Sequence, residues 1–448
     1  MDQIGRRIFL KDSAKVSAVT ALGLSALKNS TAAWAGANDR IRVAIIGIHG
    51  RGARYHANRF PTQLPGNHFT DETHKNVEVA ILCDVDESTF EPCAKTYFDE
   101  RGLKRPRFET EYRRVLNDDS IDVVSIASPN HWHSLMSIWA CEAGKDVYVE
   151  KPLSHNVWEG RQLVKAAREH KRIVQHGTQI RSNPGAREAV QKLREGIIGD
   201  VYMARGLCYK TRRSIGHTPD ELVPPGVDYD QWLGPAPVRP FSRNRFHYNW
   251  HWHWDYGNGD IGNQGVHQMD MARWGLGVGL PPRINAHGGH FTYDDDQETP
   301  NTLAASYFYP DEGRNGLLVT FEVRHINTQP EVGVSIGNIF YGSEGYMICD
   351  NYTGYKTFLK SGEGPSRYES ASHIGNFLEA VRTRNQEHLT ADVEEGHLSS
   401  AMCHLANISY RLGRSLDFDP EKEECVGDDE ANAMLTCDYR EPYIVGEI

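Results

Sequence analysis

Short runs of apolar residues recur along the first part of the chain, and segments with helical periodicity separate them. Runs this continuous are typical of strands that are buried on both faces of a sheet. Strands that alternate with helices at this spacing predict parallel βαβ units, and therefore a doubly wound α/β domain. The expected strands cover residues 41–47, 77–84, 121–127, 146–150 and 172–178.

Beyond about residue 181 the pattern changes to a strand-rich region, interrupted by an irregular stretch (210–262) that is rich in Pro, Trp, Arg and His. Strands that repeat in this way indicate an α+β domain with a mainly antiparallel sheet. The sequence thus predicts a Rossmann-type domain over residues 36–180 and an α+β domain over 181–448. In the second domain we expect strands at 201–209, 282–290, 302–309, 316–324, 333–341 and 345–350, and helices at 186–195, 374–383 and 393–412.

The composition is that of an ordinary globular protein. The chain has 448 residues, 39% of them hydrophobic and 24% charged, with a formal net charge of -11. No run of lysine and arginine stands out after the first residues, so we expect no nucleic-acid partner. The 8 cysteines form no C-x-x-C pair, which argues against zinc ribbons and thioredoxin chemistry and favours buried thiols.

The N-terminus has the layout of an export signal. Arg6 and Arg7 form a twin-arginine pair, an apolar run follows at residues 16–27, and the A-x-A sequence at 33–35 is typical of a cleavage site. The run is shorter than the roughly 20 residues that span a bilayer, so we expect no stable membrane insertion. We therefore expect residues 1–35 to direct periplasmic or other export. A cytoplasmic protein with a chance arginine pair is the alternative.

A glycine-rich hexapeptide, GIHGRG, begins at Gly47 after the first expected strand and opens a helix. It ends at Gly52 and follows the dinucleotide pattern G-x-G-x-x-G, except that His49 replaces the middle glycine. In the usual pattern that glycine lets the backbone approach a pyrophosphate. We expect Gly50 to supply the missing flexibility and Arg51 to face a phosphate. A plain βα turn that binds no nucleotide is the alternative.

Asp84 ends the next expected strand, where a carboxylate accepts hydrogen bonds from the adenosine ribose. A carboxylate there repels a 2′-phosphate, so the sequence favours NAD over NADP.

The sequence SPNHWH closes the third expected strand, so it lies at the sheet edge where ligands bind in open α/β folds. We expect a βα loop here, with Ser128, Asn130 and His133 as cofactor contacts. Asn130 also suits a substrate hydroxyl, and His131 and His133 equally fit a role in packing the loop.

The sequence EKP ends the fourth expected strand with Glu150 and Lys151. Pro152 cannot continue a strand ladder, so Lys151 is presented at the strand end. A positive nicotinamide ring nearby would lower the pKa of Lys151 and make it a better proton carrier for a sugar hydroxyl. We expect Glu150 to hold Lys151 in place and both residues to contact the cofactor. A surface ion pair is the alternative.

The stretch GDIGNQGVHQMDMARW predicts a helix and its lead-in. Asn263 and His267 are four residues apart and share a helix face, and Asp270 follows three residues later. His267 suits proton transfer at neutral pH, with Asp270 positioned to orient it. A structural histidine within a helix is the alternative.

The preceding aromatic stretch alternates tryptophan with histidine. As a strand, it would place His251 and His253 on one face and Trp250 and Trp252 on the other. Tryptophans stack on the C–H faces of sugars, so we expect a carbohydrate surface here. A zinc or manganese site that includes His247 is the alternative, but no carboxylate has metal-motif spacing, and we expect no metal.

Together, the glycine turn, Asp84, SPNHWH, EKP and the G-x-x-x-N-x-G-x-H-x-x-D stretch resemble the Gfo/Idh/MocA family, which includes glucose–fructose oxidoreductase and inositol dehydrogenase. The resemblance implies a Rossmann domain packed on an open-faced sheet that is often used for oligomerisation. It also implies that Lys151 is catalytic. The family has a catalytic Asp and a His four residues apart, and the matching positions in this chain are Asn263 and His267. Asparagine replaces the aspartate here, and it cannot take a proton at neutral pH. Expected substrate contacts are Arg181, Trp250, His251, Trp252, His253 and Asp270.

Two activities satisfy these expectations. The first is an NAD(P)-dependent oxidoreductase acting on a sugar or polyol, with a tightly bound cofactor that is recycled inside the site because free NAD is scarce outside the cytoplasm. The alternative is a redox-neutral, NAD-dependent glycosidase that works through a transient 3-keto sugar. A sugar-binding scaffold without catalysis is a third possibility. The expected partners are a small carbohydrate and further copies of the chain, as a dimer or tetramer.

Overall fold

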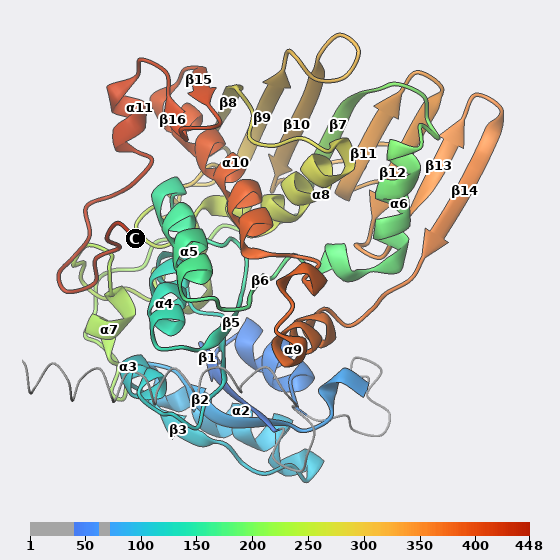
Figure 1. Cartoon of the computed structure of the whole chain (residues 1–448). Coiled ribbons are helices and arrows are strands. Elements are labelled where there is room, and N and C mark those ends of the chain that lie inside the picture. Colours follow the sequence, from blue (N-terminus) through green and yellow to red (C-terminus); the bar gives the residue numbers. More distant parts are fainter. Residues whose placement is uncertain (1–39, 62–71) are drawn as a thin grey trace, which may run out of the picture. The chain divides into compact units, whose positions relative to one another are not determined.

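The first domain contains a parallel sheet in the order β3-β2-β1-β4-β5-β6 (Figure 1). Its apolar strands lie between two hydrophobic clusters, one on each face, as the sequence predicts. The computed structural model describes residues 40–61 and 72–448. The strands are β1 (Ile41–Ile46), β2 (Val77–Cys83), β3 (Arg107–Glu109), β4 (Val123–Ile126), β5 (Asp146–Val149) and β6 (Val174–His176).

Helices cover both faces of this sheet. The side chains of α4 (Asn130–Glu142) and α5 (Val157–Glu169) pack against one face. The other face is covered by α2 (Phe90–Tyr97) and, from much later in the chain, by α9 (His373–Thr383). The short helix α3 (Tyr112–Leu116) follows β3. Because α9 belongs to the second half of the sequence, the first domain's core is completed by residues outside the predicted range 36–180.

The second sheet has ten strands in the order β14-β13-β12-β11-β7-β10-β9-β8-β15-β16. The pair β7 and β10 is parallel and the other neighbouring pairs are antiparallel, which makes the sheet mixed but mainly antiparallel. The strands are β7 (Val201–Cys208), β8 (Arg283–Gly289), β9 (Thr302–Tyr309), β10 (Leu317–Arg324), β11 (Ile336–Gly342), β12 (Gly345–Asp350), β13 (Gly354–Leu359), β14 (Gly362–Tyr368), β15 (Leu416–Asp419) and β16 (Glu424–Cys425).

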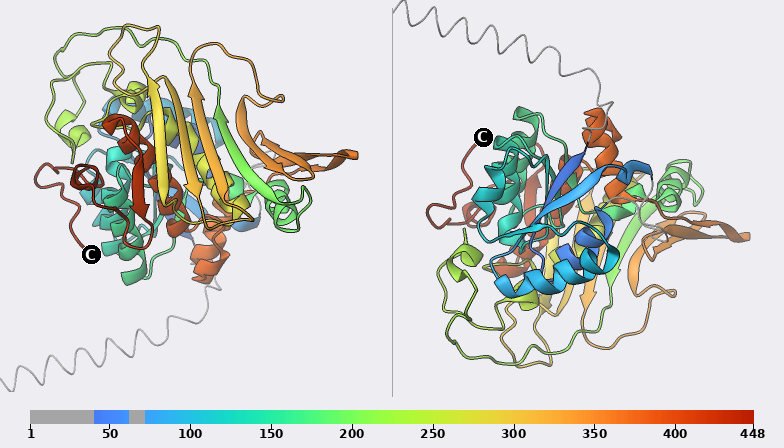
Figure 2. Two further views of the ribbon diagram at one scale, coloured as in Figure 1. Left: turned by 90° about the horizontal axis from the view of Figure 1, so that it is seen from above. Right: turned by 90° about the horizontal axis from the view of Figure 1, so that it is seen from below.

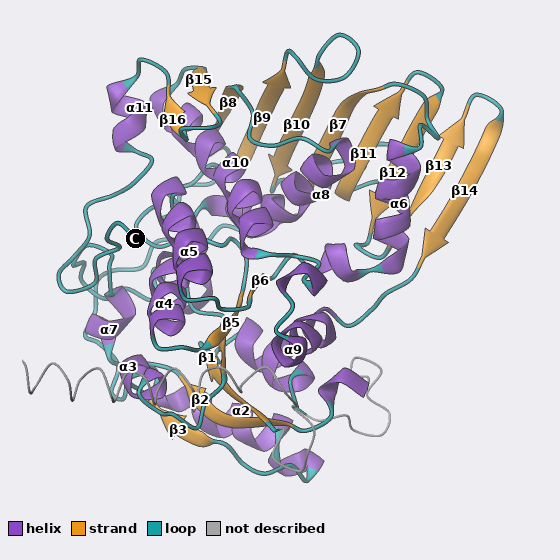
Figure 3. Cartoon of the chain, in the orientation of Figure 1, coloured by secondary structure: helices purple, strands orange, loops and turns teal. Residues whose placement is uncertain are grey.

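Helices pack on one face of this sheet (Figures 2 and 3). They are α6 (Pro184–Arg194), α8 (Val266–Leu276) and α10 (Val393–Leu412), and their apolar side chains share one core with the sheet. In β10 buried residues alternate with partly exposed ones, as expected for a sheet with one covered face. The remaining short helices are α7 (Tyr229–Leu233) and α11 (Asp429–Ala433).

Residues Ile41–Ile448 form one compact unit. The predicted export signal, residues 1–35, lies outside the described residues. Of the described cysteines, all but Cys437 are buried, in agreement with the expected buried thiols. In the described part of the chain, no helix combines the length and the apolar character needed to cross a membrane.

Candidate active site

The glycine turn after β1 is tightly built and leaves space on one side. A Cβ at Gly47, whose φ is +80°, would lie 2.7 Å from the carbonyl oxygen of Ala127, and one at Gly52 would lie 2.0 Å from that of Gly47. At Gly50, by contrast, no described atom lies within 4 Å of such a Cβ. A turn whose backbone is open on one side, followed by the π-helical turn Gly52–Ala57, fits a pyrophosphate.

Asp84 holds this turn from the neighbouring strand. Its Oδ2 accepts a hydrogen bond from the amide of Ile48 at 2.7 Å, and its Oδ1 accepts one from the amide of Asp86 at 3.1 Å. Burial raises the pKa of Asp84 to about 6, although these two amides oppose the shift. The carboxylate therefore lies where a ribose is expected, and it also fixes the conformation of the glycine turn.

Glu150 joins the end of β5 to the glycine turn. Its Oε1 lies 2.8 Å from Arg51 Nε and 3.1 Å from His56 Nε2. Burial alone would raise the pKa of Glu150, but Arg51 and His56 outweigh it and hold the pKa well below its usual range. Glu150 contacts Lys151 through the backbone amide, which donates to Glu150 Oε2 at 3.4 Å, whereas the shorter hydrogen bonds of Glu150 go to Arg51 and His56 and not to the Lys151 amine. Arg51 is likewise paired with a carboxylate, although its side chain remains partly exposed.

The Lys151 amine meets the second domain at Asn263. Its Nζ donates to the backbone carbonyl of Asn263 at 2.5 Å and to its side-chain Oδ1 at 3.0 Å. Burial lowers the pKa of Lys151 to about 8, with Glu150 opposing the shift and Arg51 adding to it. The amine is therefore held in a defined position, and its neutral form becomes available at a pH well below that of an exposed lysine.

His267 lies one turn after Asn263, at the start of α8. It is buried, and its Nδ1 has no hydrogen-bond partner among the described residues. Burial, with Lys151 adding to it, holds the pKa of His267 well below its usual value. The ring is therefore neutral at physiological pH, and its unpartnered Nδ1 can form a hydrogen bond with a ligand. Its ring centroid lies 5.2 Å from that of Tyr352.

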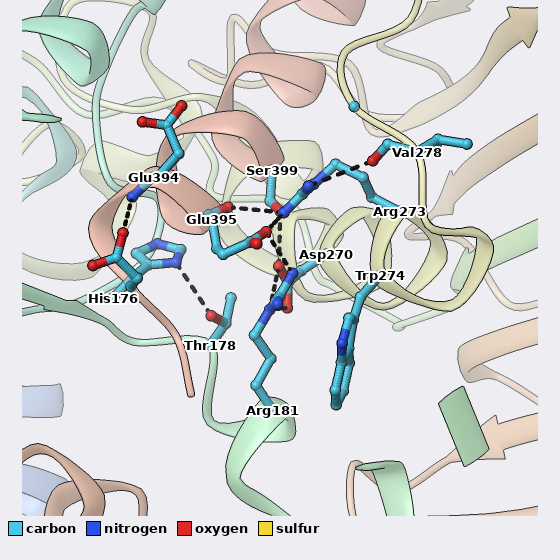
Figure 4. Close-up of polar contacts among 12 residues, drawn as sticks. His176, Thr178, Arg181, Asp270, Arg273, Trp274, Val278, Glu394, Glu395 and Ser399 are labelled. Carbon is cyan, nitrogen blue, oxygen red and sulfur yellow. Dashed lines mark hydrogen bonds and ion pairs between the residues drawn. The ribbon is translucent and has the colours of Figure 1, made fainter. Parts of the chain in front are cut away.

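Asp270 does not orient His267. The carboxylate is fully buried, and it binds Arg181 Nε at 2.8 and 2.9 Å and the hydroxyl of Ser399 at 2.8 Å (Figure 4). Arg181 also binds Glu395 of α10. Both charges are satisfied within the protein, so Arg181 and Asp270 are not the substrate contacts that were expected. They belong instead to a buried ion-pair cluster that joins the end of β6 to α8 and α10.

The aromatic stretch is not a strand. His247–Trp252 forms a 3-10 helix, so histidines and tryptophans do not separate onto two faces. His251 stacks on Trp250 with ring centroids 3.6 Å apart. Burial lowers the pKa of His251, and the charge of nearby Lys151 adds to this shift. These two rings remain candidates for substrate contact.

Trp252 and His253 are instead buried. His253 Nε2 bonds to the backbone carbonyl of Asn244 at 2.9 Å, which indicates a packing role. Among the described residues, no group of three or more His, Cys, Asp or Glu side chains is arranged to hold a metal.

The sequence SPNHWH opens a helix rather than a loop, because α4 begins at Asn130. His133 lies between the carbonyl oxygens of Pro152 and Ser128, at 2.6 and 2.8 Å, and so connects the ends of β4 and β5. Asn130 donates to Asn258 Oδ1 at 3.0 Å. Both side chains thus brace the edge of the sheet. The buried hydroxyl of Ser128 has no partner in the described part of the chain, so it is available to a ligand at this edge.

Residues 210–262, here called the covering segment, cross the carboxyl ends of several Rossmann strands. The ring of His247 stacks on that of His49 with centroids 3.7 Å apart, and its Nε2 lies 3.1 Å from Asp86 Oδ2. The amide of Glu87 donates to Gly226, and His131 Nε2 lies 3.0 Å from the carbonyl oxygen of Trp232. The segment therefore contacts residues that follow β1, β2 and β4 in the chain.

Sequence reasoning missed Asp260, which is buried and lies 3.0 Å from Asn263 Nδ2. The available signal was its position, three residues before Asn263 in the same stretch. It also missed Arg212 and His325, which bind Asp260 from distant parts of the chain.

Comparison with known proteins agrees with this arrangement. Residues 41–178 match the oxidoreductase family with an NAD-binding Rossmann fold, and residues 201–287 and 364–445 match its C-terminal alpha/beta domain. The chain belongs to the Gfo/Idh/MocA oxidoreductase family. Its first domain is an NAD-binding Rossmann domain, and the open glycine turn and the unpartnered Ser128 hydroxyl fit that cofactor.

Relatives in the family differ in activity. The chain is 27% identical over 218 residues to an alpha-N-acetylgalactosaminidase of Shewanella oneidensis, covering 45% of each protein. It is 29% identical over 168 residues to a levoglucosan dehydrogenase of Pseudarthrobacter phenanthrenivorans, covering 38% of this chain and 36% of the relative. The chain thus spans less than half the length of these curated relatives.

A solved structure extends the likeness of fold over most of the chain. The WlbA dehydrogenase of Bordetella pertussis, determined in complex with NADH and UDP-GlcNAcA, superposes with a TM-score of 0.63 at 18% identity. The match covers 85% of this chain and 99% of that one.

Proposed function

We propose that this enzyme is an NAD-dependent oxidoreductase that acts on a sugar or polyol hydroxyl and keeps its dinucleotide bound between turnovers. The observation that carries the proposal is the position of the Lys151 amine, which donates to two oxygens of Asn263. These bonds use two of the N–H groups of Lys151. The remaining position on the nitrogen is a lone pair in the neutral amine and a third N–H in the ammonium. A substrate hydroxyl can therefore exchange a proton with Lys151 at this one position.

Bound NAD would supply the hydride acceptor for such a substrate. The residues that fit it are the turn Gly47–Gly52, which leaves space at Gly50, the Asp84 carboxylate and the Ser128 hydroxyl. Lys151, as the neutral amine, takes the hydroxyl proton when the sugar is oxidised and returns it when a sugar is reduced. His267, which is neutral and lacks a partner on Nδ1 among the described residues, is a second group that can form a hydrogen bond with the substrate.

Retention of the cofactor follows from the covering segment. Its contacts at His49, Glu87 and His131 lie at the ends of three strands that border the expected dinucleotide site. A ligand beneath such a segment leaves only when those contacts open. The expected twin-arginine export fits this reading, because a cofactor held in this way remains with the enzyme outside the cytoplasm. We accordingly propose an exported, homo-oligomeric enzyme.

The glycosidase relatives support a second candidate. In that reaction a sugar hydroxyl at C3 is oxidised, which acidifies the proton at C2, and the glycosidic group leaves by elimination. Water adds to the double bond, and hydride returns to C3. The hydride and the C3 hydroxyl proton are returned, so the sum is hydrolysis, and Lys151 serves both redox steps in the same way.

One experiment separates the two. The purified enzyme is given aryl glycosides and, separately, free sugars and polyols, with no NAD added. The oxidoreductase proposal expects a change in the nicotinamide absorbance band with a free sugar and no release of phenol. Steady release of phenol without net reduction of the nicotinamide would instead establish the glycosidase. If an enzyme that carries NAD gives neither signal, both candidate functions are contradicted.

A further inference from the structure

Asp260, which is itself buried, lies at the centre of a polar cluster that ends at the Lys151 amine. Its carboxylate lies 2.6 Å from Arg212 Nε and 2.8 Å from His325 Nε2. It also accepts a hydrogen bond from Asn263 Nδ2 at 3.0 Å. Asn263 in turn receives the hydrogen bond from Lys151 on Oδ1. The side chains of Arg212, Asp260, Asn263 and Lys151 thus form one connected chain of hydrogen bonds.

This connection fixes which way the amide of Asn263 points. Burial alone would raise the pKa of Asp260, but the hydrogen bonds from His325 and Arg212 outweigh it and hold the pKa below its usual range. An ionised carboxylate can only accept hydrogen bonds. The NH2 group of Asn263 must therefore face Asp260, which leaves its oxygen for Lys151.

We propose that Asp260 is a positioning residue for Lys151, and that the pair of Asp260 and Asn263 replaces the single aspartate that the family motif has at position 263. In this chain the carboxylate stands one helical turn closer to the N-terminus, at position 260. The side-chain amide of Asn263 transmits the effect of Asp260 on Lys151, because it presents its oxygen to the amine in a fixed orientation. The proposal rests on the assignment of Lys151 as the proton-transfer group.

Other charged or titratable groups also surround Lys151 and are common to every variant considered below. They are Glu150, Arg51, Lys210, His133, His251 and His267. Removing the negative charge of Asp260 leaves the positive charges of Arg51 and Lys210 less opposed. An asparagine at position 260 can also offer either end of its amide to Asn263, which frees the Asn263 side chain to flip. Both effects favour the neutral amine at Lys151.

The test measures the Lys151 amine directly. Competitive labelling with acetic anhydride over a pH series, with the Lys151 peptide quantified by mass spectrometry, gives the pH at which the amine becomes reactive. In Asp260→Asn we expect this midpoint to fall by about one pH unit, since a nearby opposite charge shifts a pKa by about that much or more. Exposed Lys95 of the same molecules is the internal reference and should not move.

A swap provides the rescue. Asp260→Asn/Asn263→Asp places the carboxylate where the family motif has it, and we expect the midpoint to return toward that of the wild type. If the single variant does not fold, Asn263→Leu leaves Asp260 paired with Arg212 and His325 and should lower the midpoint in the same direction.

An unchanged Lys151 midpoint in folded Asp260→Asn or in Asn263→Leu overturns the proposal, as does a swap that fails to recover it. The labelling requires neither sugar turnover nor added NAD. Absence of sugar oxidation together with the expected midpoint shifts would therefore refute the proposed function alone.

Discussion

The imidazole rings of His49 and His247 lie nearly parallel, with centroids 3.7 Å apart and an interplanar angle of 17°. His49 occupies the glycine turn, and His247 belongs to the covering segment, so this stack fastens the segment over the turn. His49 breaks the dinucleotide pattern, which has a glycine at this position. Its ring gives the turn a stacking contact with His247 that a glycine could not make.

His247→Ala should weaken retention of the cofactor. An aromatic pair of this kind contributes about 1 kcal/mol, so we expect the bound dinucleotide to dissociate about fivefold faster. The measurement is the rate at which NAD leaves the purified protein after dilution. His217→Ala is the matched control, because His217 lies in the same segment but is exposed and bonds to Asp296. Equal rates in both variants would show that the stack does not retain the cofactor.

Gly50→Ala tests the proposed position of the pyrophosphate. Among the described residues, no atom lies within 4 Å of the added Cβ, so the folded state should tolerate it. A dinucleotide that approaches this backbone would collide with the methyl group, and we expect NAD affinity to fall at least tenfold with an unchanged melting temperature. Gly279→Ala, where the added Cβ also meets no described atom within 4 Å, should change neither quantity. Unchanged NAD affinity in Gly50→Ala would place the pyrophosphate elsewhere.

Asp270→Ala should destabilise the fold rather than change substrate recognition. It leaves Arg181 buried without its main partner, a change that typically costs about 3–5 kcal/mol. Chemical denaturation measures the loss, and Asp417→Ala, which breaks the exposed pair with Arg283, should cost about 1 kcal/mol or less. A large rise in KM with little loss of stability would restore Asp270 to the substrate site.

The rate of sugar oxidation should rise with pH through the titration of Lys151. The amine must be neutral to accept the hydroxyl proton, and its pKa is lowered to about 8 by burial. Below that pH the ammonium predominates and oxidation slows, whereas reduction of a keto sugar, which needs the ammonium as donor, should slow above it. The two pH profiles of kcat should therefore be mirror images. A pH-independent oxidation rate between pH 6 and about 9 would exclude Lys151 as the base.

The sequence predicted most of the elements that place the reacting groups. The apolar runs located five of the six described parallel strands but not the three-residue β3, and the i, i+4 spacing predicted that Asn263 and His267 share a helix face. Their approach to the end of the EKP strand was expected from the family resemblance, and Lys151 does meet Asn263 there. The hairpin β13–β14 was missed because β14 is largely exposed and carries no apolar alternation. The pairing of Arg181 with Asp270 joins residues 89 positions apart, and local spacing carries no signal for it.

The 3-10 helix at His247–Trp252 shows a second limit. Alternating histidine and tryptophan satisfies a strand pattern, but contacts from other parts of the chain decide the local structure, among them His49 stacked on His247. Propensity is weak against such tertiary contacts.

The central claim is that Lys151 moves the proton while the enzyme's own bound NAD takes the hydride. Its most direct test is a single turnover of Lys151→Met, compared with the wild type and with Lys95→Met, each purified with its NAD and mixed with a sugar that the wild type oxidises. We predict equal amounts of bound NAD in all three proteins, and a rate of nicotinamide reduction that falls by about 10²–10⁴ in Lys151→Met alone. Reduction at the wild-type rate in Lys151→Met would contradict the account.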